Sequence, residues 1–169
     1  MSITLNNFLP KGKEIVVPCP LKPPATYRDI IRYAKRLAGI ICTKEGVEPP
    51  TDILIRSTVK PRKDSNYIWH LSIPTGGIYD FFNERIVIAK WLVDEYLRRS
   101  EEQRYRFFCD YLVDVIAHET KHHIQWKKTA SFDEEEAYPF GKKYASECFH
   151  RCIERRGSQY EHNIRQISS

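Results

Sequence analysis

The chain has 169 residues, of which 41% are hydrophobic and 29% are charged. This composition is typical of a soluble globular protein and excludes a disordered chain, and no apolar run is long enough to span a bilayer. The formal net charge of +5 permits contact with nucleic acid but is too small to argue for it. The first residues lack the basic and apolar regions of a secretory signal, so we expect a cytoplasmic protein.

Proline is dense in the first 25 residues, which predicts an extended arm rather than a helix or a central strand. We expect residues 26–160 to form one domain and residues 161–169 to form a polar tail. Apolar residues at three- and four-residue steps predict a helix over 25–42. Two segments rich in β-branched and aromatic residues follow, and we expect them to pair as a hairpin of strands at 52–59 and 66–74.

Helical periodicity returns in the second half of the chain and predicts helices over 83–99, 101–128 and 131–156. Ser131 and Glu134 fit a capping box at the start of the last helix. Pro139 predicts a kink or a restart within that helix, and Gly157 predicts its end. Long helices beside a small β-hairpin indicate the α+β fold class.

The segment "DVIAHETKHHIQW" contains the pattern H-E-x-x-H at His118, Glu119 and His122. Residues four apart lie on one face of a helix, so two imidazoles at this spacing are able to bind one metal ion. The intervening glutamate is turned toward a water held by that metal and is able to act as its general base. The alternative interpretation is a solvated polar helix that happens to be rich in histidine.

The residues around the motif favour a supported site over a solvated helix. The preceding segment "FFCDYLVDVIA" is strongly apolar and would hold the helix in the core. Gln125 follows His118 by seven residues, so it faces the same way and is able to line the site. His123 is rotated by roughly 100° from His122, and we interpret it as a surface or supporting histidine rather than a ligand.

A catalytic zinc site needs a third protein ligand, and the start of the next helix offers Glu134, Glu135 and Glu136. A short loop would return the chain antiparallel to the motif helix, so that one of these carboxylates faces the histidines. The alternative role for the three is to complement the positive end of the helix dipole. Both roles are compatible if different glutamates fill them.

The H-E-x-x-H motif followed by a helix with "EEEA" resembles the gluzincin metallopeptidases. The segment "EEEAYPF" is similar to the third-ligand helix of the small ImmA/IrrE-type peptidases, and "FFCDYLVDVIAHE" also resembles the SprT-type arrangement. The resemblance implies a minimal zincin-like domain with the motif on a central helix. It names His118, His122 and Glu136 as metal ligands and Glu119 as the general base. Pro139 and His123 depart from the family pattern.

The resemblance further implies one Zn²⁺ per chain and a protein or peptide substrate, with no role for a membrane. The strand at 66–74 is then expected to be the edge strand that binds an extended peptide. The competing hypothesis is a non-catalytic module that uses the same helix to bind a structural metal or a protein or nucleic-acid partner. Hydrolysis of a substrate other than a peptide also stays open.

The five cysteines are scattered and odd in number, which predicts reduced thiols rather than a disulfide framework. Cys148 and Cys152 lie one helical turn apart, and we interpret them as buried thiols, with a second metal site as the alternative. Cys19 lies among the prolines of the arm. A further hypothesis is that its thiolate binds the open zinc position and holds the enzyme latent.

Overall fold

The computed structural model describes residues 16–20, 22–57 and 76–167, and it has the predicted α+β architecture. Its elements, in chain order, are α1 (Tyr27–Glu45), β1 (Asp52–Arg56), β2 (Gly77–Asp80), β3 (Arg85–Ala89), α2 (Lys90–Arg98), α3 (Glu101–Phe107), the π-helical turn η2 (Phe108–Val113), α4 (Asp114–Thr129) and α5 (Glu134–Ile167). None of the helices described is both long and apolar enough to cross a membrane.

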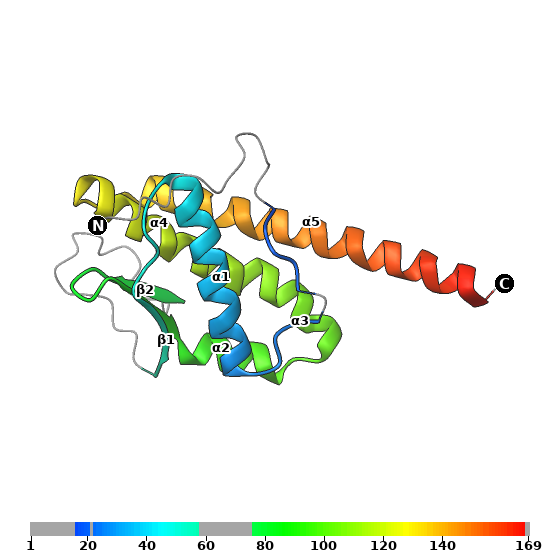
Figure 1. Ribbon diagram of the computed structural model, residues 1–169. Helices are drawn as coiled ribbons and strands as arrows, with labels where there is room; N and C mark the ends of the chain where they lie inside the picture. The colour runs from blue at the N-terminus through cyan, green and yellow to red at the C-terminus, as the bar shows by residue number, and fades with distance from the viewer. Residues whose placement is uncertain (1–15, 21, 58–75, 168–169) are drawn as a thin grey trace, which may run out of the picture.

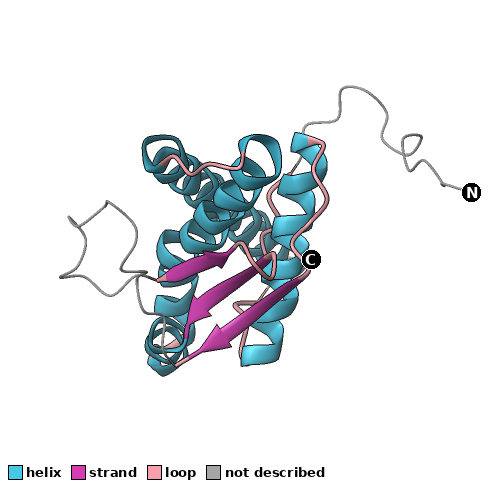
Figure 2. Ribbon diagram, turned by 90° about the vertical axis from the view of Figure 1, so that its left-hand side faces the viewer, coloured by secondary structure: helices cyan, strands magenta, loops and turns pink. Residues whose placement is uncertain are grey.

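A small mixed sheet has the strand order β1-β3-β2, with β1 parallel and β2 antiparallel to β3. The helices gather on one side of this sheet, as Figure 2 shows, and α1 and α4 contact its strands. Alternate strand residues are therefore buried against the helices, as expected of a sheet with one covered face. They are Ile53, Gly77, Tyr79, Ile86 and Ile88.

The predicted helix over 83–99 is wrong in its first half, because residues Arg85–Ala89 form β3 and only Lys90–Arg98 are helical. The segment "RIVIA" alternates in burial with a period of two, and the helical period begins only after it. The described hairpin joins β2 to β3, whereas β1 pairs in parallel with β3. The strand predicted at 66–74 lies outside the described residues.

The predicted helix over 25–42 is confirmed as α1, and both its ends are capped. The Thr26 hydroxyl accepts a hydrogen bond from the Asp29 backbone N–H. Gly46 ends the helix in the left-handed region, with a φ of 67° that a residue with a side chain rarely adopts. Its buried face, which includes Ile30, Leu37 and Ile41, packs against α4.

The predicted helix over 101–128 is confirmed as one continuous run of α3, η2 and α4, with a π-helical turn in its middle. Phe108 and Leu112 of η2 and Ile116 of α4 are fully buried. They form the centre of the core together with the α1 residues. The apolar segment before the motif therefore does hold the motif helix inside the protein, as the sequence predicts.

The last helix differs from its prediction at both ends. It begins at Glu134, and the residue before it forms the cap, because the Asp133 carboxylate accepts a hydrogen bond from the Glu136 N–H at 3.2 Å. Ser131 contacts Thr129 instead. The helix runs through Pro139 without a restart and past Gly157 to Ile167. Figure 1 shows its C-terminal half extending beyond the rest of the molecule.

The described part of the arm, residues 16–20 and 22–25, is neither helix nor strand, as predicted. Side chains from the domain hold its backbone carbonyls: Tyr33 donates to Pro18, Tyr96 to Pro24 and Arg155 to Cys19. Cys19 is also joined to Cys152 of α5 by a disulfide. The prediction that all the cysteines are reduced is thus corrected at these two positions.

Gly141 allows α5 to pack closely on α4 beside the motif. A Cβ at this position would lie 2.9 Å from the Asp114 carbonyl oxygen and 3.2 Å from the His118 Cβ. We expect Gly141→Ala to lower the free energy of unfolding by roughly 1–3 kcal/mol, the usual cost of overpacking. Denaturant unfolding followed by circular dichroism measures this change.

Gly157→Ala is the matched control, because it makes the same change in the same helix where nothing lies within 4 Å. It should leave stability unchanged or raise it by up to about 1 kcal/mol, since alanine favours a helix over glycine. Equal effects of the two substitutions would contradict the close packing of α5 at Gly141.

Candidate metal centre

His118 and His122 lie one turn apart on α4, and their Nε2 atoms are 3.1 Å from each other. The His122 side chain is buried, and that of His118 is 20% exposed. The motif spacing thus places both imidazoles on one face of a buried helix, as the sequence predicts. Two ring nitrogens point to a common position at the surface of the core.

Glu134, the first residue of α5, supplies a carboxylate to both histidines. Its Oε2 lies 3.2 Å from the His118 Nε2, and its Oε1 lies 3.1 Å from the His122 Nε2. All the ligand atoms of this group lie within 4.8 Å of one another. Donors around a tetrahedral zinc, with bonds of 2.0–2.1 Å, would be separated by about 3.4 Å, so this donor set fits such an ion.

Glu136, which the family resemblance names as the third ligand, is not brought to the histidines. Its carboxylate accepts hydrogen bonds from Lys121 at 2.8 Å and from Gln125 at 2.9 Å. Two residues along a helix correspond to a rotation of roughly 200°, so Glu134 and Glu136 cannot face the same point. Asp133 caps α5, so Glu134 is the first residue of this helix and the one whose carboxylate contacts the histidines. Glu135 is exposed.

The three charged groups shift one another's pKa values. Hydrogen bonds from His118 and His122 hold the pKa of the Glu134 carboxyl well below its usual value. Burial lowers the pKa of each histidine, but the hydrogen bond to Glu134 and the charge of Glu119 outweigh it and raise the net pKa. The Glu134 carboxylate is therefore ionised beside the two histidines, where a cation would bind.

Glu119 is buried between α4 and the sheet. A Cβ on Gly77 of β2 would lie 3.0 Å from its Cγ and 3.3 Å from its Oε1, so the glycine makes room for this side chain. The Tyr79 backbone N–H donates to its carboxylate. Burial raises the pKa of Glu119, and the nearby histidines only partly oppose this rise. A buried carboxylate with a raised pKa beside a candidate metal site is suited to accept and return a proton.

Gln125 connects the motif helix to the start of α5. Its Oε1 accepts from the Asp133 backbone N–H at 3.1 Å, and its Nε2 donates to the Asp133 carbonyl at 2.9 Å. These two bonds fix which end of the amide is the oxygen. The same Oε1 lies 3.0 Å from the His122 Nδ1, which must therefore carry the proton. A metal ion would therefore bind His122 through Nε2, the nitrogen that faces Glu134, in place of the proton that Nε2 donates there.

His123 was predicted to be a surface or a supporting histidine. It is not at the surface, so only the supporting role remains. It is fully buried, its Nε2 lies 2.7 Å from the Glu48 carbonyl, and its Nδ1 lies 2.9 Å from the Tyr79 hydroxyl. Because a carbonyl only accepts, the proton is on Nε2 and Nδ1 accepts from Tyr79. Burial lowers the pKa of His123, so the ring is neutral and ties α4 to β2.

Exposed and partly buried aromatic side chains border the histidines, a feature that the sequence analysis did not single out. The Phe132 ring packs edge-on against His122 with centroids 5.5 Å apart, and it stacks on Trp126. Phe81 contacts both Trp126 and Phe132, and Phe82 is 71% exposed. No spacing in the sequence indicates this group, because it combines the β2–β3 turn, α4 and the loop before α5.

Tyr138 is the residue of α5 that lies one turn after Glu134, on the same side of the helix. Its side chain is exposed, and Lys142 lies over its ring. Tyr144 is buried, and burial raises its pKa to about 12. Of these two tyrosines, only Tyr138 leaves its side chain exposed.

Glu134 and Glu136 can be distinguished by matched substitutions. We expect Glu134→Gln to weaken zinc binding more than about 100-fold, because it removes a charged ligand. Glu136→Gln should weaken it about tenfold at most, since Glu136 acts only through Gln125 and Lys121. Competition with a chromophoric chelator measures both affinities. A larger effect of Glu136→Gln would return that residue to the ligand set.

Gln125→Met keeps the side-chain volume but removes every hydrogen bond of the amide. We expect zinc affinity to fall about 10–100-fold, because His122 loses the group that orients it. Stability should fall by about 1–3 kcal/mol as the Asp133 backbone groups lose their partner. Isothermal titration with zinc and denaturant unfolding give the two values.

Gln103→Met, at an exposed position of α3, is the control for the same chemical change. It should alter neither quantity. If Gln125→Met behaved like this control, the amide would have no role in positioning His122 or α5.

Comparison of the chain with protein-family models, with curated proteins and with solved structures found no match. The chemistry of this centre is therefore inferred from its own residues. These are a pair of histidines, a bridging carboxylate and a buried glutamate beside them.

Proposed function

We propose that this protein is a zinc-dependent metallopeptidase. The observation that carries the proposal is the convergence of His118, His122 and Glu134 to within 4.8 Å, next to the buried carboxylate of Glu119. Catalytic zinc sites use three protein ligands of this kind and leave one position for water. A zinc ion held there would polarise a carbonyl and lower the pKa of water.

His118, His122 and Glu134 would hold the metal in the proposed mechanism, and Glu134 takes the place of Glu136. Glu119 accepts a proton from the attacking water at its carboxylate and later returns it to the leaving amine. Its raised pKa brings it closer to the range in which both steps are efficient. Gln125 keeps the His122 proton on Nδ1, so that Nε2 remains a ligand.

The surroundings of the centre suit an extended substrate with an apolar side chain. Of the described strands, β2 is the edge strand that contacts α4, and it is antiparallel to its neighbour. The aromatic group of Phe81, Phe82, Trp126 and Phe132 borders the same histidines. We propose that the substrate side chain packs on this group, where an apolar residue would bury the most surface.

The rival hypothesis, a non-catalytic metal-binding module, makes no use of Glu119. It predicts that the metal stays bound without turnover and that Glu119 serves only packing. The distinction is therefore a kinetic one, measured on protein whose metal content is known.

Glu119→Gln tests the proposal, because it keeps the shape of the side chain but removes its capacity to accept a proton. We expect zinc content to remain near that of the wild type and hydrolysis of a quenched fluorescent peptide library to fall by about 10²–10⁴-fold. His118→Ala/His122→Ala should lose both metal at this centre and activity.

Glu102→Gln, at an exposed position of α3, is the control and should hydrolyse the library at the wild-type rate. Turnover retained in Glu119→Gln would remove this residue from the mechanism. A zinc-loaded wild type that cleaves no peptide of the library would favour the non-catalytic module.

A further inference from the structure

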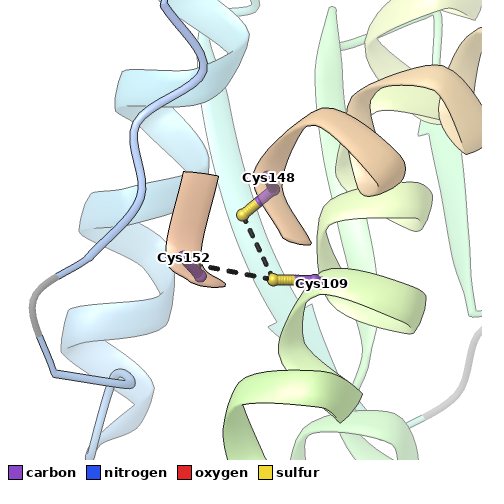
Figure 3. A group of neighbouring side chains, drawn as sticks. All are labelled: Cys109, Cys148 and Cys152. Carbon is purple, nitrogen blue, oxygen red and sulfur yellow. Dashed lines mark hydrogen bonds between the residues drawn. The ribbon is translucent and has the colours of Figure 1, made fainter. Parts of the chain in front are cut away.

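A second cluster of metal-binding atoms lies in the core, at the contact between η2 and α5. Cys109 of η2 and Cys148 and Cys152 of α5 are buried, and their sulfurs lie within 4.8 Å of one another. Figure 3 shows the sulfurs of Cys109 and Cys148 facing each other, and its dashed lines mark the contacts of Cys109 with Cys148 and Cys152. Cys148 follows Glu134 by fourteen residues, about 21 Å along the helix axis, so this cluster is distinct from the histidine centre.

Cys19 brings a fourth sulfur to the same place, because it is joined to Cys152. The arm that carries it is fixed independently of the sulfur chemistry. Tyr33 donates to the Pro18 carbonyl at 2.8 Å, and Arg155 donates to the Cys19 carbonyl at 3.0 Å. These bonds would hold Cys19 near the other cysteines when the disulfide is reduced.

The separations of the Cys109 sulfur from those of Cys148 and Cys152 are close to those around a single ion. Cys109 Sγ lies 3.3 Å from Cys148 Sγ and 4.0 Å from Cys152 Sγ. Four thiolates around a tetrahedral zinc with bonds of about 2.3 Å would be separated by about 3.8 Å, between these two values. A cluster of several irons, in which each cysteine binds a different iron, would need the sulfurs farther apart.

Simple packing of buried thiols accounts less well for this arrangement. A buried cysteine behaves as a small apolar side chain and needs no sulfur neighbour. Cys42 is such a residue: it is fully buried in α1, belongs to no cluster, and burial raises the pKa of its thiol to about 12. The other four cysteines come from three separate segments and meet at one point.

We propose that Cys19, Cys109, Cys148 and Cys152 form a tetrathiolate site for one structural Zn²⁺ when the Cys19–Cys152 disulfide is reduced. A dithiol or phosphine reductant supplies the two electrons that break the S–S bond, and two protons give two thiols. Binding of Zn²⁺ to the four thiols then releases four protons. The disulfide and the zinc site are alternative states of the same residues, and in both the arm is fastened to α5.

The Tyr33 hydroxyl gives this site a polar neighbour, since it lies 3.8 Å from Cys148 Sγ. Because its single proton is donated to the Pro18 carbonyl, the hydroxyl oxygen accepts a hydrogen bond from the Cys148 thiol. The inference does not rest on the proposed peptidase activity, because none of these residues belongs to the histidine centre.

The first experiment counts zinc in the untagged full-length chain, purified with a phosphine reductant and then dialysed against zinc-free buffer. It uses a His118→Ala/His122→Ala background, so that the histidine centre contributes no metal. We expect about one zinc per chain in this background. Adding Cys109→Ala should bring it to none, whereas adding Cys42→Ala, the matched control, should leave it at one.

Cobalt substitution gives a second readout that requires no cysteine variant. In the same histidine double variant, Co²⁺ should produce the intense sulfur-to-metal charge-transfer absorption of a thiolate site, and X-ray absorption of the zinc form should give only sulfur ligands at about 2.3 Å. Titration of the denatured zinc form should find all five thiols reduced.

No zinc and no charge-transfer absorption in the reduced double variant would overturn the proposal, as would equal metal loss in the Cys109 and Cys42 variants. Three free thiols and a disulfide that persists in the reductant would also overturn it. Failure of the peptidase hypothesis is separable, because it would appear only in wild type, as zinc or activity missing at the histidine centre.

Discussion

The amide of Gln125 is the interaction on which the geometry of the histidine centre depends. It pairs with both backbone groups of Asp133, and in doing so it fixes the position at which α5 begins. The same oxygen holds the His122 ring, so the first residue of α5 and the second histidine are set by one side chain. Each bond contributes only about 1 kcal/mol, but a buried amide without partners would cost more, so few other arrangements are accessible.

Two adjacent histidines on α4 use their rings in opposite ways. His122 donates through Nδ1 to an amide oxygen, whereas His123 donates through Nε2 to a backbone carbonyl. One ring is turned toward the candidate ligands and the other toward the sheet. His123 and Tyr79 thereby position β2, whose backbone in turn contacts Glu119. The contacts that support Glu119 and those that support the candidate ligands are thus separate networks on one helix.

The sequence indicated the two histidines, Glu119 and the helix that carries them, because these depend only on a local helical spacing. It did not distinguish among three consecutive glutamates. That choice depends on where α5 begins, which Asp133 and Gln125 decide across two elements. Helical spacing predicts which residues share a face once the first residue of a helix is known. Here that first residue is set by a contact between α4 and the start of α5, which hydrophobic periodicity does not show.

The strand at Arg85–Ala89 was missed for a different reason. Its five residues run directly into α2, and a short apolar segment fits either period when it is read with its neighbour. Pairing with β1 and β2 on both sides decided the outcome. The convergence of the cysteines was equally hidden, since Cys19 and Cys152 are 133 residues apart in sequence.

The π-helical turn η2 has a consequence for how far the chain length may vary. Cys109 and His118 are nine positions apart in sequence, and in a regular α-helix their side chains would project about 180° apart. A π turn absorbs one extra residue, so the two project as if eight residues apart, within about 80° of each other. The helix therefore contains one residue more than a regular α-helix between these two positions would need. A deletion within 108–113 would convert the turn to regular α-helix and keep both residues toward α5, whereas a further insertion would have no turn left to absorb it.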